Sequence, residues 1–387
     1  MKYLKLILFF FILKISVLKA QKLDIAIFFD SNITSVTMAT DTGSYVIFAD
    51  TNLMKLNAKD AISISIVNDS LRLRNLEKNL GVFKTIKISG IGKLNIFKIK
   101  PNEPNLPQRT YEDGVLFRTK YGKIEIINQV EVDKYLAGVI ETEGGSKAEL
   151  EFYKAHALIS RTYTLANMEK HLFEGFNLCD GVHCQAYKGK CVKNLRILEA
   201  SKSTHDLVIV DSLNQYIQAA FHSNCGGVTD NSANVWVSSK SYLASVSDTF
   251  CMRKRNAKWT QEISADEWRK YLIRFGAKVP DTNYAETFKF TQYSRHKDYE
   301  YGGVKLPLRD IRSDWKFRST FFNIEPSGTK LIITGRGYGH GVGLCQEGAM
   351  RMAELGYKYD KIIKKYYKNV EIVPNSLLIQ SKQQTKF

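Results

Sequence analysis

β-Branched and aromatic residues recur in short runs along residues 21–100, and this pattern predicts a series of short β-strands. The runs read LDIAIFF, SVTMAT, SYVIFAD, ISISIVND and FKTIKIS. Residues 41–43 (DTG) and 68–70 (NDS) supply turn residues between them. A stretch with prolines, KPNEPNLPQ, predicts a boundary near residues 100–108. Residues 21–108 are therefore expected to form a small all-β accessory unit followed by a linker.

Helical and strand patterns are mixed over residues 109–375, which are expected to form a mixed α/β domain. Strand character resumes over residues 109–135, with hairpin turns expected at its DG and YG pairs. A Cys- and Gly-containing loop follows residue 172, and after it come a helix-like segment and two alternating runs, LVIVDS and YIQAAFHS. A helix is expected over residues 265–275, and the region from TKLIITG to KNVEIV predicts strand, Gly-rich loop, two helices and strand. With a polar tail at residues 376–387, the predicted fold class is α+β.

One stretch, Tyr135–Ala166, is the centre of the candidate chemistry. It predicts a short extended segment, a tight Gly-Gly loop and a long helix that ends near His171. Ser146 is the expected N-cap of this helix, because Glu149 follows three residues later and completes a capping box.

Four charged residues distinguish this stretch. Glu141 and Glu143 lie before the expected helix, and Lys154 and Arg161 lie inside it. The two cations are seven residues apart, so they project from nearly the same side. This arrangement is typical of an active-site wall, and equally of a solvated helix edge on which long cations extend to water.

The first twenty residues predict an exported protein. Lys2 and Lys5 precede a run rich in Leu, Ile and Phe, which ends at the small residue Ala20. This is the pattern of a cleavable signal peptide over residues 1–20. The alternative is an uncleaved anchor, but the run is short for a membrane span and Lys14 interrupts it. We therefore expect export to a periplasm, the cell wall or the extracellular space, with no membrane span once the signal is cleaved.

The chain is strongly basic, with a formal charge of +17 over 387 residues. The leader carries four Lys and no acids, so the rest carries 17 − 4 = +13. Such a charge attracts anionic polymers, which outside the cytoplasm are lipids, cell-wall peptides and polysaccharides. The sequence contains no zinc-finger or RNA-binding signature, so nucleic acid is not an expected partner.

A second candidate element is the loop Gly335–Gly343, GRGYGHGVG, in which glycines alternate. Glycine lets a backbone approach another surface closely, and the helix expected to begin near Cys345 presents unpaired N–H groups. The spacing matches neither a P-loop nor a dinucleotide fingerprint. The loop is thus a candidate ligand wall or a tight turn packed on the core, and His340 is a structural residue, a ligand or a catalytic partner. Cys345 is either a nucleophile activated at a helix N-terminus or a small buried residue.

Six cysteines are present, and an even number in an exported protein permits disulfides. Three of them fall with two histidines in one segment of about twenty residues, and these five are His171, Cys179, His183, Cys184 and Cys191. Thiolate and imidazole ligands suit zinc, although the spacing is not that of a standard finger. Zinc and disulfides, including one between Cys225 and Cys251, both remain open from the spacing.

Several motifs in one order resemble the SpoIID/LytB family, the stage II sporulation protein D type. They are YLAGVIETE with EFYKAHALISRTYTLA, then CDGVHCQAYKG, FHSNCGGVTDN, and GRGYGHGVGLCQEGAMRMAELG. The resemblance covers roughly residues 109–373. It implies a cell-wall enzyme, because the enzymatic members are lytic transglycosylases that cleave peptidoglycan glycan strands, especially strands stripped of stem peptides.

The resemblance also implies roles for individual residues. The catalytic acid of the family motif GVV-x-x-E falls on Glu143, although Gly144-Gly145 follows it where the family usually has Met-Pro. The motif's Lys and Arg fall on Lys154 and Arg161, and its Gln falls on His156.

The other family positions extend the expected site. Tyr338, His340 and Gln346 would form the opposite wall of a substrate groove. Some members bind zinc through one His and two Cys, which here match His171, Cys179 and Cys184.

The predicted reaction needs one carboxyl group used twice, first as acid and then as base, so a second carboxylate is not required. Glu141 is the backup acid, expected on the solvent side of a strand. Two rival hypotheses remain. One is a non-catalytic wall-binding protein that stimulates a cell-wall amidase, as the LytB branch suggests, and the other is a hydrolase that uses Cys345.

Overall fold

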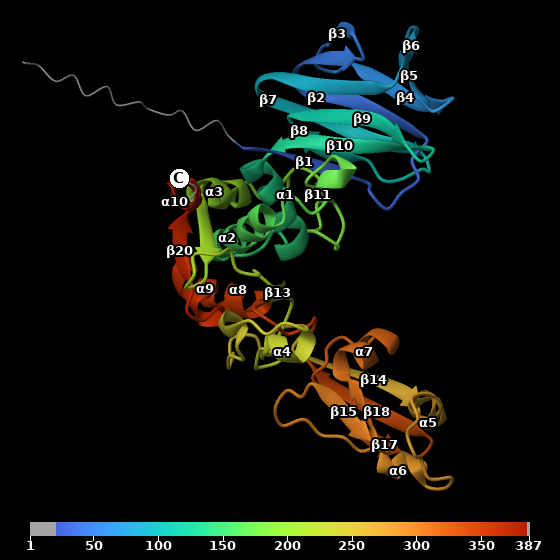
Figure 1. Cartoon of the computed structure of the whole chain (residues 1–387), viewed down its shortest axis with the longest axis vertical. Coiled ribbons are helices and arrows are strands. Elements are labelled where there is room, and N and C mark those ends of the chain that lie inside the picture. Colours follow the sequence, from blue (N-terminus) through green and yellow to red (C-terminus); the bar gives the residue numbers. More distant parts are fainter. Residues whose placement is uncertain (1–20, 385–387) are drawn as a thin grey trace, which may run out of the picture.

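The computed structural model describes residues 21–384, which form three parts that follow one another along the long axis (Figure 1). A large sheet lies at one end, a helical part lies in the middle, and a smaller unit of strands and short helices lies at the other end. The α+β class is confirmed. The expected signal peptide lies outside the described residues. None of the described helices combines the length and apolar character needed to cross a bilayer.

The large sheet has eleven strands in the order β11-β1-β10-β9-β7-β2-β4-β5-β6, with β3 paired to β2 and β8 paired to β7. Its pairs are antiparallel except β1 with β11, which is parallel. The strands are β1 (Lys22–Ile27), β2 (Ser35–Ala49), β3 (Asn52–Leu56), β4 (Ala61–Val67), β5 (Ser70–Asn75), β6 (Asn79–Phe83), β7 (Thr85–Glu103), β8 (Arg109–Glu112), β9 (Gly114–Lys120), β10 (Lys123–Glu131) and β11 (Leu178–Cys179).

Three predictions for this region differ from the structure. Residues 41–43 do not form a turn, because β2 runs straight through them and pairs with β7 on both sides, with register shifts that absorb the extra residues. The proline stretch at residues 100–108 contains the end of β7 and the short connection from β7 to its partner β8, so it is part of the sheet and does not separate two domains. Residues 109–131, assigned above to the second domain, form β8, β9 and β10 of the same sheet. The expected turns at residues 68–70 and 121–122 do connect neighbouring antiparallel strands.

The middle part packs helices and short strands against the sheet, and the buried apolar core is continuous across both. Ile127 of β10, Leu136 and Leu158 belong to this common core. Its elements are α1 (Val132–Gly144), α2 (Leu150–Ala166), η1 (Leu172–Glu174), α3 (Arg196–Ser203), β12 (Leu207–Val210), β13 (Phe221–His222), α4 (Ser232–Val235), η2 (Ser241–Leu243), β19 (Leu344–Cys345), α8 (Gln346–Glu354), α9 (Tyr359–Tyr366), β20 (Glu371–Pro374) and α10 (Asn375–Gln384). The last of these helices occupies most of the segment expected to be a polar tail.

The centre of the candidate chemistry contains two helices where we expected one. Residues 135–144 belong to α1 and are not extended, because Tyr135, Leu136, Val139 and Ile140 all face the core at helical spacing. The second helix, α2, begins at Leu150 with Glu149 at its N-cap and no side-chain cap. The expected capping box is therefore wrong.

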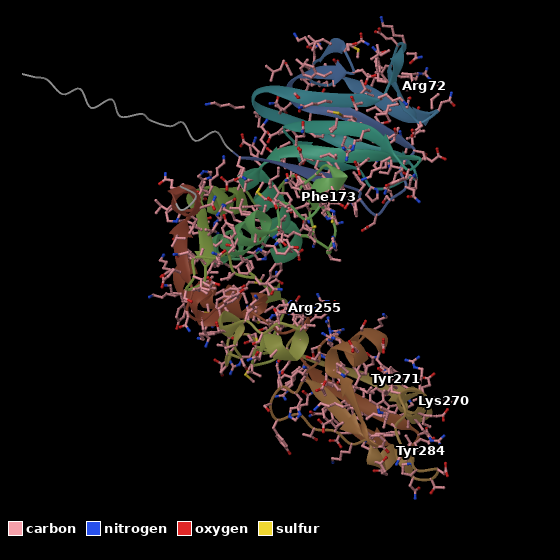
Figure 2. All side chains as sticks on the ribbon, in the orientation of Figure 1. Arg72, Phe173, Arg255, Lys270, Tyr271 and Tyr284 are labelled. Carbon is pink, nitrogen blue, oxygen red and sulfur yellow. The ribbon has the colours of Figure 1, made fainter. Side chains whose placement is uncertain are left out.

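The third part is residues 258–336, which have a hydrophobic core of their own that includes Trp268, Phe317 and Ile333. Figure 2 shows Lys270, Tyr271 and Tyr284 on this part, far along the chain from the sheet. Ser264 caps its main helix by accepting a hydrogen bond from the Glu267 amide at 3.3 Å, as expected for a helix near residues 265–275. Its elements are β14 (Lys258–Ser264), α5 (Ala265–Arg274), α6 (Tyr284–Thr287), β15 (Asp298–Tyr301), β16 (Val304–Pro307), α7 (Leu308–Asp314), β17 (Phe322–Ser327) and β18 (Lys330–Arg336).

Candidate functional site

Glu143 lies in the last turn of α1, with its carboxyl group half buried. Its Oε1 accepts a hydrogen bond from the Ala186 amide at 2.9 Å. Burial raises the pKa of Glu143, and the Ala186 amide and the charge of Lys188 oppose this rise. Within residues 21–380 this carboxyl forms no ion pair, and its Oε2 makes no hydrogen bond. It is thus a carboxyl group that holds its proton to higher pH than an ordinary glutamate.

Glu141 lies two residues before Glu143, but its carboxylate has different hydrogen-bond partners. It is on α1, so the expectation of a strand's solvent side is wrong. Its carboxylate accepts hydrogen bonds from the Val192, Lys193 and Asn194 amides at 3.1, 2.7 and 3.2 Å, and from the Cys191 thiol at 3.1 Å. A carboxylate whose two oxygens are both occupied by donors from residues 191–194 organises that loop.

The end of α1 is joined to the segment after the Gly-rich loop through Gln346. The Gln346 side-chain amide donates to the Glu143 carbonyl at 3.1 Å and also to His156 Nε2 at 3.1 Å. His156 is fully buried, and burial lowers its pKa to about 4, so its ring is neutral and accepts at Nε2. Its Nδ1 then donates to Ser160 Oγ at 3.2 Å. Three of the predicted site residues, Glu143, His156 and Gln346, therefore meet.

The two glycines after Glu143 fit this geometry. A Cβ on Gly144 would lie 3.0 Å from the Phe152 ring, which is tighter than an ordinary contact. Gly145 has φ 72° and ψ −178°, a conformation that is essentially restricted to glycine. The loop thus takes a path that the family's Met-Pro would not follow.

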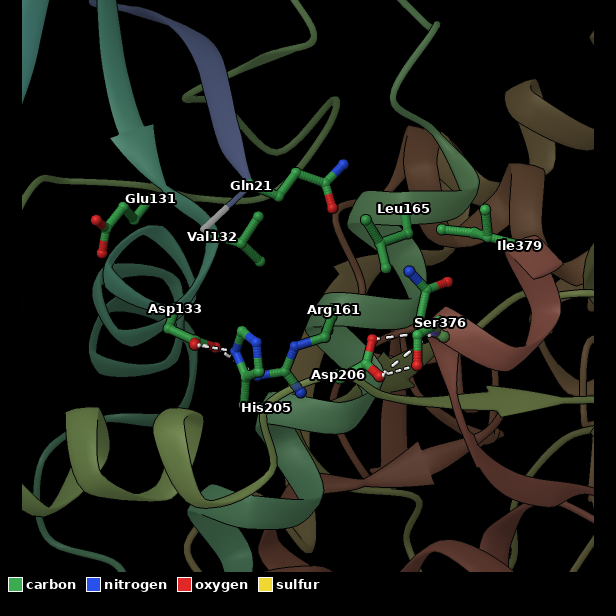
Figure 3. A pocket seen from close by; sticks show the side chains of 11 residues that line it. Gln21, Glu131, Val132, Asp133, Arg161, Leu165, His205, Asp206, Ser376 and Ile379 are labelled. Carbon is green, nitrogen blue, oxygen red and sulfur yellow. Dashed lines mark hydrogen bonds and ion pairs between the residues drawn. The ribbon is translucent and has the colours of Figure 1, made fainter. Parts of the chain in front are cut away.

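Arg161 does not join Glu143. It is 2% exposed, and its guanidinium donates to Asp133 Oδ1 at 2.7 Å, the Thr204 carbonyl at 2.7 Å and the Ser201 carbonyl at 2.9 Å. Asp133 and Glu143 are ten residues apart on α1, which separates them by about 15 Å along the helix. Arg161 instead lines a cavity of about 230 Å³ with Asp133 and His205 (Figure 3). The expectation that Arg161 lines the groove beside Glu143 is wrong, because the carboxylate that pairs with it is at the other end of α1.

Lys154 is partly buried, and its ammonium pairs with Glu151 of the same helix at 2.9 Å. Glu151 also accepts from the Tyr359 amide at 3.0 Å, which ties α2 to the start of α9. No hydrogen bond within residues 21–380 joins Lys154 to Glu143.

The Gly-rich loop pairs with the segment after β13 through two isolated β-bridges. One joins Asn224 to Tyr338, and the other joins Asp230 to Val342. Tyr338 is 44% exposed. His340 Nδ1 accepts from the Val342 amide at 3.1 Å, and burial lowers the pKa of His340 to about 4. A Cβ on Gly343 would lie 2.1 Å from the Ala220 carbonyl oxygen, so this close approach requires glycine. Neither Tyr338 nor His340 hydrogen bonds to Glu143 within the described part of the chain.

The cysteine loop brings four potential metal ligands together. His171, Cys179, His183 and Cys184 offer ligand atoms that all lie within 4.8 Å of one another. Cys184 Sγ is 3.4 Å from His171 Nε2 and 3.7 Å from His183 Nδ1, and Cys179 Sγ is 3.7 Å from the same His183 atom. Tetrahedral zinc with two sulfur and two nitrogen ligands separates them by about 3.3–3.8 Å, so the set fits this metal. The loop that carries these ligands continues into Ala186, the donor to Glu143.

The turn before this cluster is apolar and open to solvent. Phe173 is fully exposed two residues after the candidate ligand His171, and Figure 2 shows it on the side of the middle part that faces the sheet. Two other cysteines with suggested roles, Cys191 and Cys345, do not belong to this cluster. Cys191 donates to Glu141, and Cys345 is completely buried. A solvent-reachable nucleophile at Cys345 is therefore wrong.

Several residues at the site were missed by sequence reasoning. His183 was one of the five candidate residues in the cysteine segment, but the family match did not include it, and its position next to Cys184 gave no sign that both side chains point to one centre. Ala186 and Lys188 act on Glu143 across 43 and 45 residues of chain, and a backbone amide leaves no sequence signal. Asp133 could have been found as an acid at the start of a helix, where an anion is favoured.

Comparisons with known proteins agree with the motifs. The family model for stage II sporulation protein SpoIID matches residues 120–210. The chain is 29% identical over 273 residues to stage II sporulation protein D of Bacillus subtilis (strain 168), an alignment that covers 66% of this chain and 78% of the relative.

Two further relatives extend this comparison. An uncharacterized protein of Brachyspira hyodysenteriae is 27% identical over 302 residues, covering 72% of this chain and 80% of the relative. The amidase enhancer of B. subtilis is 25% identical over 284 residues, covering 60% of this chain but 39% of the relative. The motifs, the matched family model and these relatives agree with one another, and together they support a place for this chain in the SpoIID family.

Proposed function

We propose that this chain is an exported cell-wall enzyme that cleaves peptidoglycan glycan strands by lytic transglycosylation, with Glu143 as the single acid and base. The observation that carries this proposal is the Glu143 carboxyl group, which is half buried, free of ion pairs within residues 21–380, and raised in pKa by burial. The basic charge of the chain suits an anionic wall polymer.

The reaction balances with one carboxyl group. Protonated Glu143 donates its proton to the glycosidic oxygen, and the bond from that oxygen to C1 of the muramic acid breaks. The 6-hydroxyl of the same sugar then attacks C1, and Glu143 takes its proton, which restores the acid and leaves a 1,6-anhydro end. No water is consumed. The Ala186 amide holds Oε1 and leaves Oε2 to carry the proton.

Gln346 and His156 serve as positioning residues in this proposal. Both act on the backbone that carries Glu143, through the Gln346 bond to its carbonyl. Because His156 is buried and neutral, the contact adds no charge that would lower the pKa of the acid. Their role is to fix the direction in which the Glu143 side chain projects from the end of α1.

Zinc is proposed at His171, Cys179, His183 and Cys184, with an organising role. When bound, the ion would cross-link the loop and contribute to its folding free energy. The Ala186 amide lies two residues beyond Cys184, so a fixed loop keeps this donor on Glu143.

Analysis of products tests the proposed reaction. Purified glycan strands without stem peptides are incubated with the protein, and the ends are identified by mass spectrometry. Anhydro-ended fragments are expected. Reducing ends would mean that water attacks C1, which would contradict the mechanism. Intact strands would contradict the proposal that the chain is an enzyme.

Removing the charge of Lys188 should move the pH profile of cleavage. Cleavage needs protonated Glu143, so its rate falls as pH rises through the pKa of this group. Lys188 lowers that pKa, so Lys188→Met should raise it and shift the descending limb to higher pH. Initial rates across pH at low salt measure the shift, because salt screens an exposed charge. Lys193→Met is the control, since it removes one charge from the same loop without acting on Glu143, and equal shifts in both variants would contradict this account.

Loss of one ligand should empty the proposed zinc site. Cys184→Ser removes one of four ligand atoms, and bound zinc should fall by one equivalent relative to wild type in elemental analysis of protein purified without chelator. Cys191→Ser, outside the cluster, should keep the wild-type content. Unchanged zinc in Cys184→Ser would show that this cluster holds none.

The amidase-enhancer relative favours a second candidate, a wall-binding protein that stimulates a cell-wall amidase. An enhancer makes no use of the proton on Glu143. Stimulation of an amidase that survives Glu143→Gln, with no glycan cleavage by either protein, would support this alternative.

A further inference from the structure

A second group of metal-binding side chains lies apart from the first and from Glu143. Three cysteines and one aspartate converge from three segments of the middle part: Cys225 after β13, Asp248 and Cys251 before β14, and Cys345 at the start of α8. All four are 0% exposed.

The distances fit a single small ion. The four ligand atoms lie within 4.8 Å of one another. Cys225 Sγ is 3.4 Å from Cys251 Sγ and 3.3 Å from Asp248 Oδ2. Thiolates around tetrahedral zinc are separated by about 3.8 Å, whereas sulfurs in a disulfide are about 2.05 Å apart. The pairs are thus spaced as ligands that share a centre.

The chemistry of the donor set also favours a metal over a disulfide. A Cys225–Cys251 disulfide would use two of the three thiols and leave Cys345 and a carboxylate buried beside it. A buried carboxylate is costly unless it is paired or coordinates a metal. Soft thiolates with one carboxylate select zinc over the hard cations calcium and magnesium.

Outer contacts hold the set in place, as they do around metal ligands. Asp248 Oδ2 accepts from the Tyr366 hydroxyl at 3.0 Å, and its Oδ1 accepts from the Phe250 amide at 2.9 Å. The Cys225 amide donates to Cys345 Sγ at 3.3 Å. A Cβ on Gly348 would lie 2.3 Å from Asp248 Oδ2, so the helix can pass this close only at a glycine.

A buried cation next to the cluster can offset the negative charge of such a site. Arg295 is buried, and its guanidinium donates to the Cys225 carbonyl at 2.7 Å. Its pair with Asp230, at 3.4 Å, is long, so its charge is not fully committed to that partner.

We propose that Cys225, Asp248, Cys251 and Cys345 bind a second zinc ion, which clamps the start of α8 to the loops after β13 and before β14. Cys345 is followed directly by Gln346, whose amide holds the Glu143 carbonyl. The ion therefore fixes the register of Gln346. The site does not depend on glycan cleavage, because it is defined by its own ligands.

Metal counting on the full chain tests the site. Protein purified without chelator is examined by native mass spectrometry, with elemental analysis as a second count. Wild type is expected to carry two zinc ions. Cys345→Ser and Cys184→Ser should each carry one, and Cys191→Ser should keep two. Wild-type zinc in Cys345→Ser, with one ion lost only in Cys184→Ser, would overturn the second site and leave the first intact.

Thiol counting needs no variant and covers the case in which Cys345→Ser does not fold. Wild type is alkylated in denaturant with chelator and without reductant. Six modified cysteines are expected, because all six are free. Four modified cysteines, with peptide mapping that joins Cys225 to Cys251, would overturn the proposal in favour of a disulfide.

Discussion

Glu143→Gln should slow the formation of anhydro-ended glycan by about 10²–10⁴-fold in initial rate, the usual contribution of a general acid or base. The substituted side chain keeps an oxygen for the Ala186 amide, which donates to Glu143 at 2.9 Å, but it has no acidic proton to give. Binding of glycan should change little, because the size and position of the side chain are kept. Initial rates of anhydro-end formation and a pull-down on insoluble glycan measure the two effects.

Glu149→Gln is the matched control, because Glu149 is an exposed acid of the same helix pair and its partner Arg196 is also exposed. It should retain wild-type activity. If Glu143→Gln cleaves glycan as wild type does, Glu143 is not the acid.

Although Glu143→Gln should greatly reduce activity, it should increase the stability of the folded protein at neutral pH. The folded-state pKa of Glu143 lies above its ordinary value of 4.5, because burial disfavours the carboxylate. The charged form therefore destabilises the folded state at neutral pH, and this cost disappears as pH falls below the ordinary value. Glu143→Gln should melt higher than wild type at pH 7 and equally at low pH. A residue kept for structure would show a loss of stability instead.

Arg161→Met should destabilise the fold by about 3–5 kcal/mol, because it leaves the largely buried Asp133 without its guanidinium partner. The guanidinium also satisfies the carbonyls of Ser201 and Thr204, at 2.9 and 2.7 Å. These bonds join α1, α2 and the end of α3, so their loss affects three elements at once. Denaturant unfolding of the purified variant measures the change.

Lys154→Met provides the comparison on the same helix. Its pair with Glu151 is partly exposed, and such pairs contribute about 0–1 kcal/mol. A small effect of Arg161→Met on stability, together with a large effect on glycan binding, would contradict this account and support a substrate-binding role for Arg161.

Local pattern was sufficient for some of the fold. The turns at residues 68–70 and 121–122 have positive φ at positions occupied by Asn, Asp, Tyr and Gly. Asn, Asp and Gly are typical of such turns, so the sequence predicted both. The helix α5 shows its cap and its acidic first turn directly. The start of α1 was missed because Tyr135, Leu136, Val139 and Ile140 form a short apolar run, and such a run does not distinguish strand from helix.

Long-range packing decided what local pattern left open. Residues 41–43 have turn chemistry, yet β7 offers a partner on both sides and the strand continues. Lys154 and Arg161 share a helix side by spacing, but only the position of Asp133 determines that Arg161 is buried at the far end of α1.

Residue identities alone indicated the family resemblance, the α+β class, Glu143 as the candidate acid and the chemical type of the candidate metal ligands. Those properties depend on residue identity and short spacings, which are present before the chain folds. Folding was needed to show that His183 lies in the first cluster, that Cys225 and Cys345 meet across 120 residues, and that the Ala186 amide donates to Glu143. These contacts are long-range, and their geometry exists only when the core that joins the sheet to the helices is packed.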